Sequence, residues 1–537
     1  MGTFINNAEV IVQTLKKAGV THGFGIPSGN VLPLMDAMRK HDLPFVLTAH
    51  EGSAGFAADV MGRISGAPGL GIATLGPGAT NLATGVGSAW LDRSPMIAIT
   101  CNLNTDQLGR RIQMYIDHHQ LFGPITKATL PLREGSVAQT VAEAVQIALS
   151  EPQGPVHLDL PEDVALAPAT EDVPELRGPI RQAFAPVDSL NMAIDVLASA
   201  RRPVAMIGSN AMRMTDPTLL GSLINRHGLP FATTTMAKGL IDEAHPLSVG
   251  CIERGRRQMQ RTFLQQADLI IGLGYDTIEV EYEAWINDTP LLQVDIEPVD
   301  IAGSVVLKGE VTGNLDASVA ALLEAEPIVN DWTAAEIAVH RVGFQGALRP
   351  EVRHFSPHQV IDIVRDVLPP DGILTFDVGA HTHQIASQWA VHAPRQFHIT
   401  NGWSSMGFGL PSAIAAKLNQ PGLPVVCILG DGCFQMTSGE LATAKRLGLC
   451  LPVVVLDDRW LGLIRVKQER RQLPSYGTAL QAEEYRDPPE HYFGVPAFGA
   501  RDAETLRGSL VRAFLSEGPT VIEAVVDVAH YSETIFD

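Results

Sequence analysis

Short apolar, β-branched runs alternate with helical stretches along the chain. The run THGFGIP is followed by NVLPLMDAMRKH, and PFVLTAH is followed by EGSAGFAADVMGRISG. This alternation is typical of strand-helix-strand units, because each helix must cover a face of a parallel sheet to bury its own apolar stripe. The sequence therefore predicts an α/β fold of doubly wound parallel sheets.

Two segments rich in proline and charge interrupt this alternation, at residues 160–188 and 326–356. Such segments are typical of linkers. At about 150 residues per domain, a chain of 537 residues holds three or four domains. We therefore predict domains at 1–165, 186–340 and 356–537. The first and third share glycine-rich strand-to-helix turns, so we expect two similar domains that flank a different one.

Charge and cysteine content disfavour several classes of protein. Asp and Glu number 59 against 39 Lys and Arg, and the net charge of −20 argues against nucleic-acid binding. The five cysteines form no CxxC pair, so neither a disulfide framework nor a zinc knuckle is indicated, and a reducing, cytoplasmic compartment fits best. The first residues hold no apolar signal core, and no apolar run reaches the ~18 residues of a membrane helix, so we expect neither export nor membrane insertion.

The strongest chemical signal is an acidic residue at the end of each of two predicted strands. Asp431, within Gly430-Asp431-Gly432, follows a strand at Val425–Leu429. Asp458 follows a strand at Pro452–Leu456 and lies 27 residues after Asp431, a spacing that suits one strand-helix-strand passage. If the strands are parallel neighbours, both carboxylates lie at the edge of the sheet where α/β proteins bind ligands. Two carboxylates, a backbone carbonyl and ligand phosphates would suit octahedral Mg²⁺.

Local features of the same segment support a ligand site. The glycines at 430 and 432 let the backbone approach a diphosphate, whose charge a helix N-terminus favours. The next helix is expected from Thr437 to Leu447, because Thr437 and Glu440 have the spacing of a capping box. A glycine turn alone is usually only a turn, so the prediction rests on its combination with Asp457-Asp458.

This combination resembles the thiamine-diphosphate enzymes, whose signature is GDG followed one strand later by Asn or Asp. Asp458 stands where the usual residue is Asn, a departure that resembles the catabolic, FAD-independent acetolactate synthases. The resemblance implies a pyrimidine-binding, a middle and a diphosphate-binding domain, with thiamine diphosphate and Mg²⁺ as cofactors. It implies that Asp431, Asp458 and the backbone carbonyl of Trp460 hold the metal. The residues expected to bind the cofactor here are Gly379, Ala380, His381, Gly430, Gly432, Cys433, Leu461, Gly462, Leu463 and Ile464, with Gly379, Ala380 and His381 near its diphosphate.

Glu51 lies just after a predicted strand, in the first turn of a predicted helix. Such a glutamate is ordinarily a surface residue that interacts favourably with the helix dipole. The resemblance implies another role, because a partly buried carboxyl can share a proton with the pyrimidine N1′ of thiamine, so that the cofactor's imino group removes its C2 proton. The segment ATLGPGATNL resembles the pyrimidine-binding domain, and the contacts expected there are Thr74, Gly76, Pro77, Gly78 and Asn81.

A third match is NGWSSMGFGLPSAIAA at 401–416. The family places a bulky apolar residue beneath the bent cofactor, and Met406 fits that position, although a lone Met is more often ordinary core. Ser404 would offer its carbonyl to the cofactor's amino group. Glu51 and GDG lie in different predicted domains, and the family builds each site between two chains. A homodimer or homotetramer is therefore expected.

The resemblance weakens where substrate would bind. Gln113 matches an active-site Gln of the synthases, whereas Tyr115, His118 and His119 match less well. Adjacent histidines are more often structural, and proton transfer or substrate recognition is the alternative role. Lys467 stands where FAD-dependent relatives carry Trp. It is either a solvated side chain or a cation that meets an acidic substrate.

In the middle domain, GYDTIEVEY matches the FAD-independent synthases, so no FAD is expected. The chain has no full GxGxxG, Walker A, HExxH or GxSxG motif, which leaves nicotinamide, P-loop, zinc-protease and hydrolase interpretations without support. The leading function is decarboxylation of a 2-oxo acid, pyruvate first, with ligation to a second carbonyl. The alternatives are another thiamine-dependent decarboxylase, lyase or carboligase, and a catalytically silent paralogue that regulates a partner.

Overall fold

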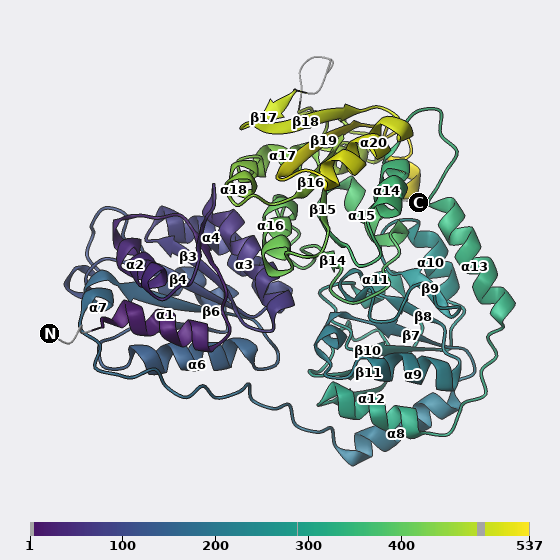
Figure 1. Cartoon of the computed structure of the whole chain (residues 1–537). Helices are drawn as coiled ribbons and strands as arrows, with labels where there is room; N and C mark the ends of the chain where they lie inside the picture. Colours follow the sequence, from purple (N-terminus) through teal and green to yellow (C-terminus); the bar gives the residue numbers. More distant parts are fainter. Residues whose placement is uncertain (1–4, 287, 481–488, 536–537) are drawn as a thin grey trace.

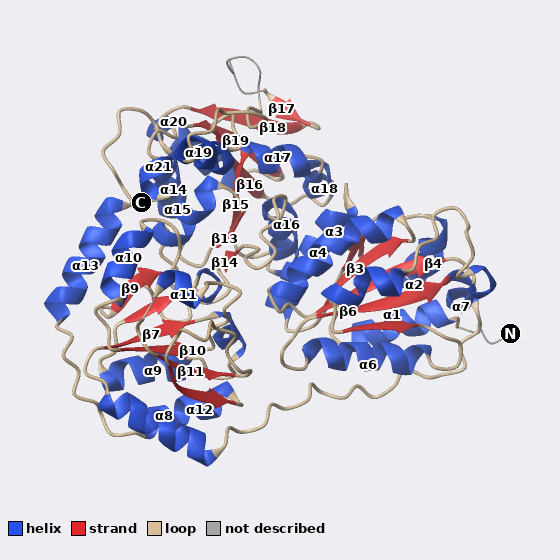
Figure 2. Ribbon diagram, turned by 180° about the vertical axis from the view of Figure 1, so that it is seen from behind, coloured by secondary structure: helices blue, strands red, loops and turns tan. Residues whose placement is uncertain are grey.

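Three sheets of mainly parallel strands organise the chain in the computed structural model, which describes residues 5–286, 288–480 and 489–535 (Figure 1). Figure 2 shows helices on both sides of each sheet. Strands buried on both faces need such cover, because no polar face is left for solvent. The prediction of an α/β chain with three doubly wound sheets is confirmed. None of the helices in the described ranges is long and apolar enough to span a membrane.

The first sheet has six parallel strands in the order β2-β1-β3-β4-β6-β5. The strands are β1 (Gly23–Gly25), β2 (Phe45–Leu47), β3 (Gly69–Thr74), β4 (Met96–Asn102), β5 (Ala128–Pro131) and β6 (Pro155–Pro161). The helices are α1 (Asn7–Lys17), α2 (Leu32–Lys40), α3 (Glu51–Ser65), α4 (Pro77–Leu91), α5 (His118–Phe122), α6 (Val137–Leu149) and α7 (Glu162–Leu166). Because β2 and β3 both run parallel to β1, the turns that start α3 and α4 lie at one edge of this sheet.

An extended segment leads from α7 to the middle domain along the outside of the molecule (Figure 1). The middle sheet is also parallel, in the order β12-β11-β10-β7-β8-β9. Its strands are β7 (Pro203–Ile207), β8 (Phe231–Thr233), β9 (Ser248–Cys251), β10 (Leu269–Leu273), β11 (Leu291–Asp295) and β12 (Leu307–Thr312). Its helices are α8 (Val187–Ser199), α9 (Thr218–His227), α10 (Arg257–Leu264), α11 (Tyr282–Trp285), α12 (Leu315–Glu324) and α13 (Ala334–Ala347).

The third sheet has the order β14-β13-β15-β16-β19-β18-β17, and β17 pairs with β18 antiparallel at its edge. Its strands are β13 (Ile373–Phe376), β14 (Phe397–His398), β15 (Val425–Gly430), β16 (Leu451–Asp457), β17 (His491–Tyr492), β18 (Val495–Ala500) and β19 (Pro519–Val525). Its helices are α14 (Pro357–Val367), α15 (Ala380–Gln388), α16 (Gly409–Asn419), α17 (Asp431–Thr437), α18 (Glu440–Arg446), α19 (Gly462–Arg470), α20 (Ala503–Phe514) and α21 (Tyr531–Thr534).

Two local predictions are wrong. The segment 326–356, expected as a linker, contains the helix α13, which begins with a capping box formed by Thr333 and Glu336. The capping box expected at Thr437 does not form, because a helix starts directly at Asp431 and Thr437 is its last residue. Short-range spacing alone does not separate these cases, since the same pattern caps one helix and ends another.

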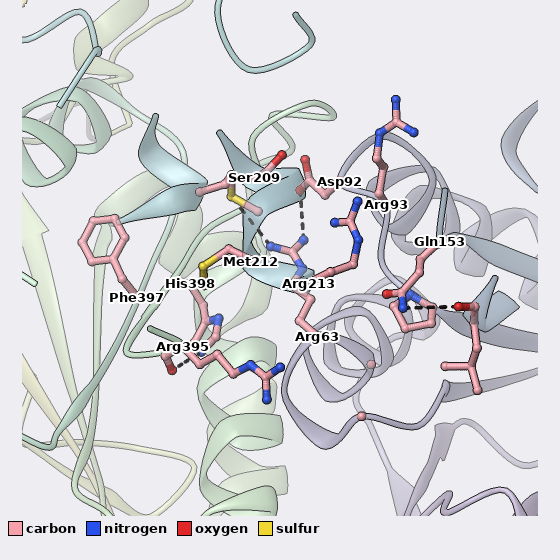
Figure 3. Close-up of a pocket in the computed structure, with 15 residues that line it drawn as sticks. Arg63, Asp92, Arg93, Gln153, Ser209, Met212, Arg213, Arg395, Phe397 and His398 are labelled. Atoms are coloured by element: carbon pink, nitrogen blue, oxygen red, sulfur yellow. Dashed lines mark hydrogen bonds and ion pairs between the residues drawn. The ribbon is translucent and has the colours of Figure 1, made fainter. Parts of the chain in front are cut away.

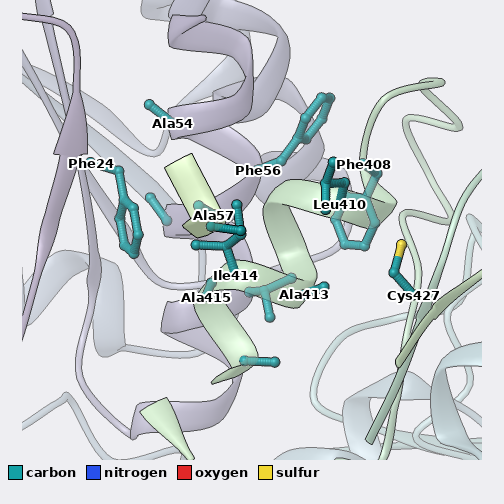
Figure 4. Packing of buried hydrophobic residues seen from close by; sticks show 14 of the residues in the cluster. Phe24, Ala54, Phe56, Ala57, Phe408, Leu410, Ala413, Ile414, Ala415 and Cys427 are labelled. Atoms are coloured by element: carbon teal, nitrogen blue, oxygen red, sulfur yellow. The ribbon is translucent and has the colours of Figure 1, made fainter. Parts of the chain in front are cut away.

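The first and third domains meet where α3 packs on α16. Phe56 of α3 lies edge-on against Phe408, with ring centroids 5.7 Å apart. Ala54, Ala57 and Ala413 belong to the same buried cluster (Figure 4). Such small side chains let two helices approach closely, so the interface buries apolar surface from both domains in one core.

Arg63 adds a polar anchor to this interface. Its guanidinium donates to Asp92 at 2.9 Å and to the backbone carbonyl of Ile399 at 2.7 Å. Asp92 also accepts the backbone N–H groups of Asn401 at 3.0 Å and Gly402 at 2.7 Å. The anchor borders a cavity of about 190 Å³ where the three domains meet (Figure 3). Arg63 thus ties the segment after β14 to the first domain.

Gly55 of α3 and Gly85 of α4 mark the closest approach of these helices, and Gly85 supplies a test. A Cβ on Gly85 would lie 2.4 Å from the Cα of Gly55. We expect Gly85→Ala to force the helices apart and lower the melting temperature by several degrees, a cost of about 1–3 kcal/mol. Gly221→Ala in α9 is the matched control, because open space surrounds its Cβ and it should be neutral or slightly stabilising. Equal melting temperatures for the two variants would contradict the close approach.

Candidate active site

A cavity of about 210 Å³ lies at the carboxyl edge of the third sheet, and many of its lining residues directly follow β13, β15 and β16. It gathers residues that the sequence predicts to bind the expected cofactor or its metal, from segments far apart in the chain. These are Gly379, Ala380, His381, Ser404, Met406, Gly430, Asp431, Gly432, Cys433, Asp458, Trp460, Leu461, Gly462, Leu463 and Ile464. Val378, Leu456 and Tyr531 line the cavity too. No sequence signal pointed to Tyr531, because α21 reaches the site only through folding.

Neighbouring parallel strands bring the two predicted acidic ligands together. β15 pairs with β16 in parallel, Asp431 begins α17 directly after β15, and Asp458 follows β16. Asp431 accepts the backbone N–H of Arg459 at 2.7 Å, and Asp458 accepts that of Trp460 at 2.8 Å. The loop after β16 is thereby folded back over the turn after β15, so both carboxyl groups face one cavity.

The electrostatics of this pair favour a bound cation. Burial, followed by the charges of Asp458 and Asp457, raises the pKa of Asp431 to about 8, and burial raises the pKa of Asp458 to about 7. Buried carboxyls of like charge retain protons unless a cation compensates them. No group of three or more His, Cys, Asp or Glu side chains among the described residues could hold a metal alone. A divalent ion here would need backbone and ligand oxygens as well, which fits the donor set for Mg²⁺.

Glycines keep the floor of the cavity open. A Cβ on Gly432 would lie 2.8 Å from Cδ2 of Leu461 and 3.2 Å from Cε of Met406, and one on Gly430 would lie 3.1 Å from Cε1 of His381. The Nε2 atom of His381 is buried without a hydrogen-bond partner, and burial lowers the pKa of this side chain to about 4. A neutral imidazole with an unpaired nitrogen, beside close backbone turns, fits a polar ligand such as a diphosphate.

Asp377 positions the loop that carries Ser404 and Met406, a role that the sequence analysis missed. Its carboxylate accepts the backbone N–H groups of Gly407 at 3.0 Å and Gly409 at 3.0 Å. Ser404 lies in the left-handed region with φ of +49°, which is unfavourable for a residue with a side chain. Strained backbone of this kind persists where surrounding contacts fix it, commonly at functional sites. The signal available in the sequence was an acidic residue directly after an apolar strand, in FDVGAH.

The first-domain half of the predicted site also assembles. Glu51 begins α3 and is 8% exposed, and its Oε2 atom accepts a hydrogen bond from Asn81 at 3.0 Å. A Cβ on Gly78 would lie 3.3 Å from the other carboxylate oxygen, and the hydroxyl of Thr74 is buried without a partner. Among the described residues, none from the first domain lines the third-domain cavity. One chain therefore presents two half-sites, each with unpaired polar atoms.

Glu440 links the first half-site to the third domain. Its carboxylate accepts the backbone N–H of Ala49 at 2.9 Å and the hydroxyl of Thr443 at 2.8 Å. Glu440 therefore fixes the turn before Glu51, instead of capping its own helix as the sequence analysis expected. Sequence spacing could not reveal this contact, since its partner is 391 positions away.

His118 and His119 occupy different environments. His118 is buried beneath the Gly76 turn, with Nε2 3.4 Å from the Gly76 nitrogen and Nδ1 2.9 Å from the Thr100 hydroxyl. His119 is partly exposed and contacts the hydroxyl of Thr129 at 2.8 Å. These contacts favour a supporting role for His118 and leave substrate recognition by His119 a prediction. The nearby loop carries Gln113, exposed, and Tyr115, half-buried.

Lys467 does not line the cofactor cavity. It lies on α19 beside a second cavity of about 490 Å³, between the middle and third domains. The two cavities share Val378, Gly379, Ser404 and Leu463, so they adjoin through a common wall. The second cavity is therefore the space next to the cofactor half-site that a substrate can occupy.

Comparison with known proteins assigns the chain to a family. Three family models match in chain order: the N-terminal thiamine pyrophosphate binding domain over residues 5–121, the central domain over 190–322 and the C-terminal thiamine pyrophosphate binding domain over 377–524. The chain belongs to the thiamine pyrophosphate enzymes, and thiamine diphosphate is its cofactor.

Individual relatives carry a narrower name. The acetolactate synthase large subunit of Parasynechococcus marenigrum is 31% identical over 97% of this chain and 88% of its own length. The acetolactate synthase isozyme 1 large subunit of Escherichia coli is 32% identical over 86% of this chain and 83% of its own length. A probable acetolactate synthase large subunit of Methanocaldococcus jannaschii is 29% identical over 98% and 92%. This chain is thus a thiamine-dependent enzyme similar to acetolactate synthases.

The hydrogen bond between Glu440 and the Ala49 backbone yields a prediction that tests whether Glu440 acts through this bond or through its negative charge. Glu440→Ala removes the acceptor of the Ala49 N–H, so we expect a stability loss of about 0.5–1.5 kcal/mol and slower turnover. Glu440→Gln should retain most of both, because its amide oxygen still accepts the bond. Thermal melting and steady-state turnover measure the two effects. Equal losses in both variants would show that Glu440 does not act through this hydrogen bond.

Proposed function

We propose that the chain decarboxylates a 2-oxo acid, pyruvate first, and joins the remaining fragment to a second carbonyl compound, as in acetolactate formation. The observation that carries this proposal is the cavity in which Asp431, Asp458 and the glycine turns meet, in a chain whose relatives are named acetolactate synthase. A small 2-oxo acid is the corresponding substrate class. The adjoining 490 Å³ cavity supplies the room for it.

Mg²⁺ is the metal that fits the cofactor half-site best. Asp431, Asp458 and the backbone carbonyl of Trp460 would supply protein oxygens, and phosphate oxygens would complete the set. The raised pKa values of both aspartates, caused first by burial, support this assignment, because a divalent cation compensates buried negative charge.

Thiamine diphosphate, when bound, supplies an acidic C–H and an electron sink for decarboxylation. The residues of this chain would bind it and control the proton. Glu51, held by Asn81, would share a proton with the pyrimidine ring. Met406 lies over Gly432 and would support the bend between the two rings. His381 and the turns at 379–381 and 430–433 would surround the diphosphate.

Two half-sites on one chain are best joined by a second copy. Glu51 belongs to the first domain and does not line the third-domain cavity, whereas the proposed chemistry needs both. We therefore propose a homodimer or homotetramer in which Glu51 of one copy meets the metal half-site of another. The family resemblance supports the same arrangement.

No flavin is included in this proposal, because the GYDTIEVEY segment after β10 resembles that of the FAD-independent synthases. Asn210 donates to the buried carboxyl of Asp295 at 3.1 Å, and Gln293 donates to the carbonyl of Tyr275 at 2.7 Å. A Cβ on Gly208 would lie 2.4 Å from the Cα of Tyr275. Dinucleotides bind at the carboxyl edge of an open α/β sheet. These contacts occupy part of that edge, and the proposal of an FAD-independent enzyme rests on the GYDTIEVEY segment.

Two alternatives remain distinct from acetolactate formation. Another thiamine-dependent decarboxylase, lyase or carboligase is favoured by the charged second cavity, which contains Arg254, Glu281 and Lys467. Product analysis with different acceptors separates these reactions. A catalytically silent regulatory paralogue is disfavoured, because Glu51 and Asp431 are both present in ordered half-sites.

The first functional test is turnover of pyruvate by wild type and by Glu51→Gln, with thiamine diphosphate and Mg²⁺. Wild type should release CO2 and form acetolactate. Glu51→Gln should bind the cofactor with unchanged affinity but lose turnover by orders of magnitude, because an amide cannot share the proton. Hydrogen–deuterium exchange at cofactor C2 reports this step directly. Exchange at the wild-type rate in the variant would show that Glu51 does not take part in the proton transfer and is only the first residue of α3.

The metal half-site is tested by Asp458→Ala. We expect this variant to stay folded but to bind thiamine diphosphate at least tenfold more weakly, on the order of 1.4 kcal/mol or more, because the diphosphate loses its bridging cation. Asp371→Ala is the matched control, since this exposed aspartate does not line the cavity. Calorimetric titration in the presence of Mg²⁺ measures both affinities. Unchanged affinity in Asp458→Ala would exclude Asp458 as a ligand.

A further inference from the structure

The 490 Å³ cavity between the middle and third domains contains two cations that nothing in the proposed mechanism uses. Arg254 follows β9 of the middle domain, and Lys467 lies on α19 of the third domain. Within residues 5–286, 288–480 and 489–535, neither side chain has a hydrogen bond or ion pair. Burial, followed by the charges of Arg254 and Arg471, lowers the pKa of Lys467. Two positive groups thus influence each other across one cavity.

The acidic residue next to Arg254 in the chain, Glu253, forms its hydrogen bonds with groups other than the Arg254 side chain. Glu253 accepts His383 at 3.0 Å, the hydroxyl of Thr235 at 3.1 Å and the backbone N–H of Arg254 at 2.6 Å. Burial opposes its ionisation, yet His383 and, more weakly, the Arg254 backbone and charge lower the pKa of Glu253 to about 2. This carboxylate is therefore ionised, but its oxygens point to His383, Thr235 and a backbone group, so they leave the side chain of Arg254 without a direct partner.

In the part of the chain that the structure describes, the other charged side chains that line the cavity form no ion pair with Arg254 or Lys467. Burial raises the pKa of Glu279 to about 7, and this carboxyl accepts the backbone N–H of Ser209 at 2.8 Å. Arg257 lies over the ring of Trp285 at 4.8 Å. Glu281 is exposed and forms no ion pair with either cation. In a chain with a net charge of −20, two cations in one cavity whose side chains form no direct ion pair with a described residue indicate a place for a negatively charged ligand.

We infer that Arg254 and Lys467 form one subsite for an acceptor that carries two negative charges, such as an oxo compound with two carboxylates. The inference rests on the proposed carboligation and names its acceptor class. Two cations match a dianion better than the single carboxylate of pyruvate, and charge-assisted contacts are the stronger hydrogen bonds. The volume agrees, because cavities of about 300–1,000 Å³ hold molecules much larger than a three-carbon acid.

The subsite is tested by binding of unreactive analogues to the holoenzyme with thiamine diphosphate and Mg²⁺. Glutarate and pentanoate have the same chain length and differ by one carboxylate. We expect calorimetry to show glutarate bound at least about tenfold more tightly than pentanoate. Arg254→Met and Lys467→Met should each reduce this preference to about threefold or less. Arg254→Lys should retain part of it, and Arg177→Met, in the exposed segment between the first two domains, is the matched control and should retain all of it.

Equal affinities for the two acids in wild type, or a full preference in Arg254→Met, would overturn the subsite. Release of CO2 from pyruvate, measured on the same preparation, tests the proposed reaction separately. An enzyme that decarboxylates pyruvate without a dicarboxylate preference refutes only the subsite. An enzyme with the preference and no CO2 release refutes only pyruvate as donor, because the binding measurement needs no turnover.

Discussion

Two buried carboxyl groups at the ends of neighbouring parallel strands are the constraint on which the site depends. Parallel pairing of β15 with β16 leaves Asp431 and Asp458 at one edge, where burial raises both pKa values and the charge of Asp458 raises that of Asp431 further. Water no longer compensates their charge, so a divalent cation, which ligand phosphates would help to hold, does so best. The backbone bonds to Arg459 and Trp460 hold this unfavourable arrangement in place.

The second constraint is the joint core of the first and third domains. Phe56, Phe408 and Arg63 fix α3 against α16, and Glu440 fixes the turn that precedes Glu51. These contacts set the orientation of the Glu51 carboxyl from a distant part of the chain. A rigid interface of this kind suits the proposed role of Glu51 as a proton donor to the cofactor, because small displacements of such a group are costly.

The middle domain contributes in a different way. At the carboxyl ends of its strands Asn210 donates to Asp295 and Gln293 donates to Tyr275, and the neighbouring loops after β9 and β10 are open to a cavity. The domain supplies a wall of this cavity beside the cofactor half-site, with Arg254 opposite Lys467 of the third domain. A domain with the same type of sheet as its neighbours thereby shapes the substrate space and leaves cofactor binding to the other two.

The sequence by itself determined the three parallel sheets and the residue types of the site, because strand-helix alternation and the Gly430–Asp458 spacing are local patterns. Tertiary structure decided which contacts those residues make. Glu440 has the spacing of a capping residue, yet its carboxylate accepts the backbone N–H of Ala49. Asp377 accepts the backbone N–H of Gly407, a contact that cannot be read from sequence spacing because the two residues are far apart in the chain. Local spacing constrains only one turn of chain, whereas burial and hydrogen bonding between distant segments are settled by packing alone.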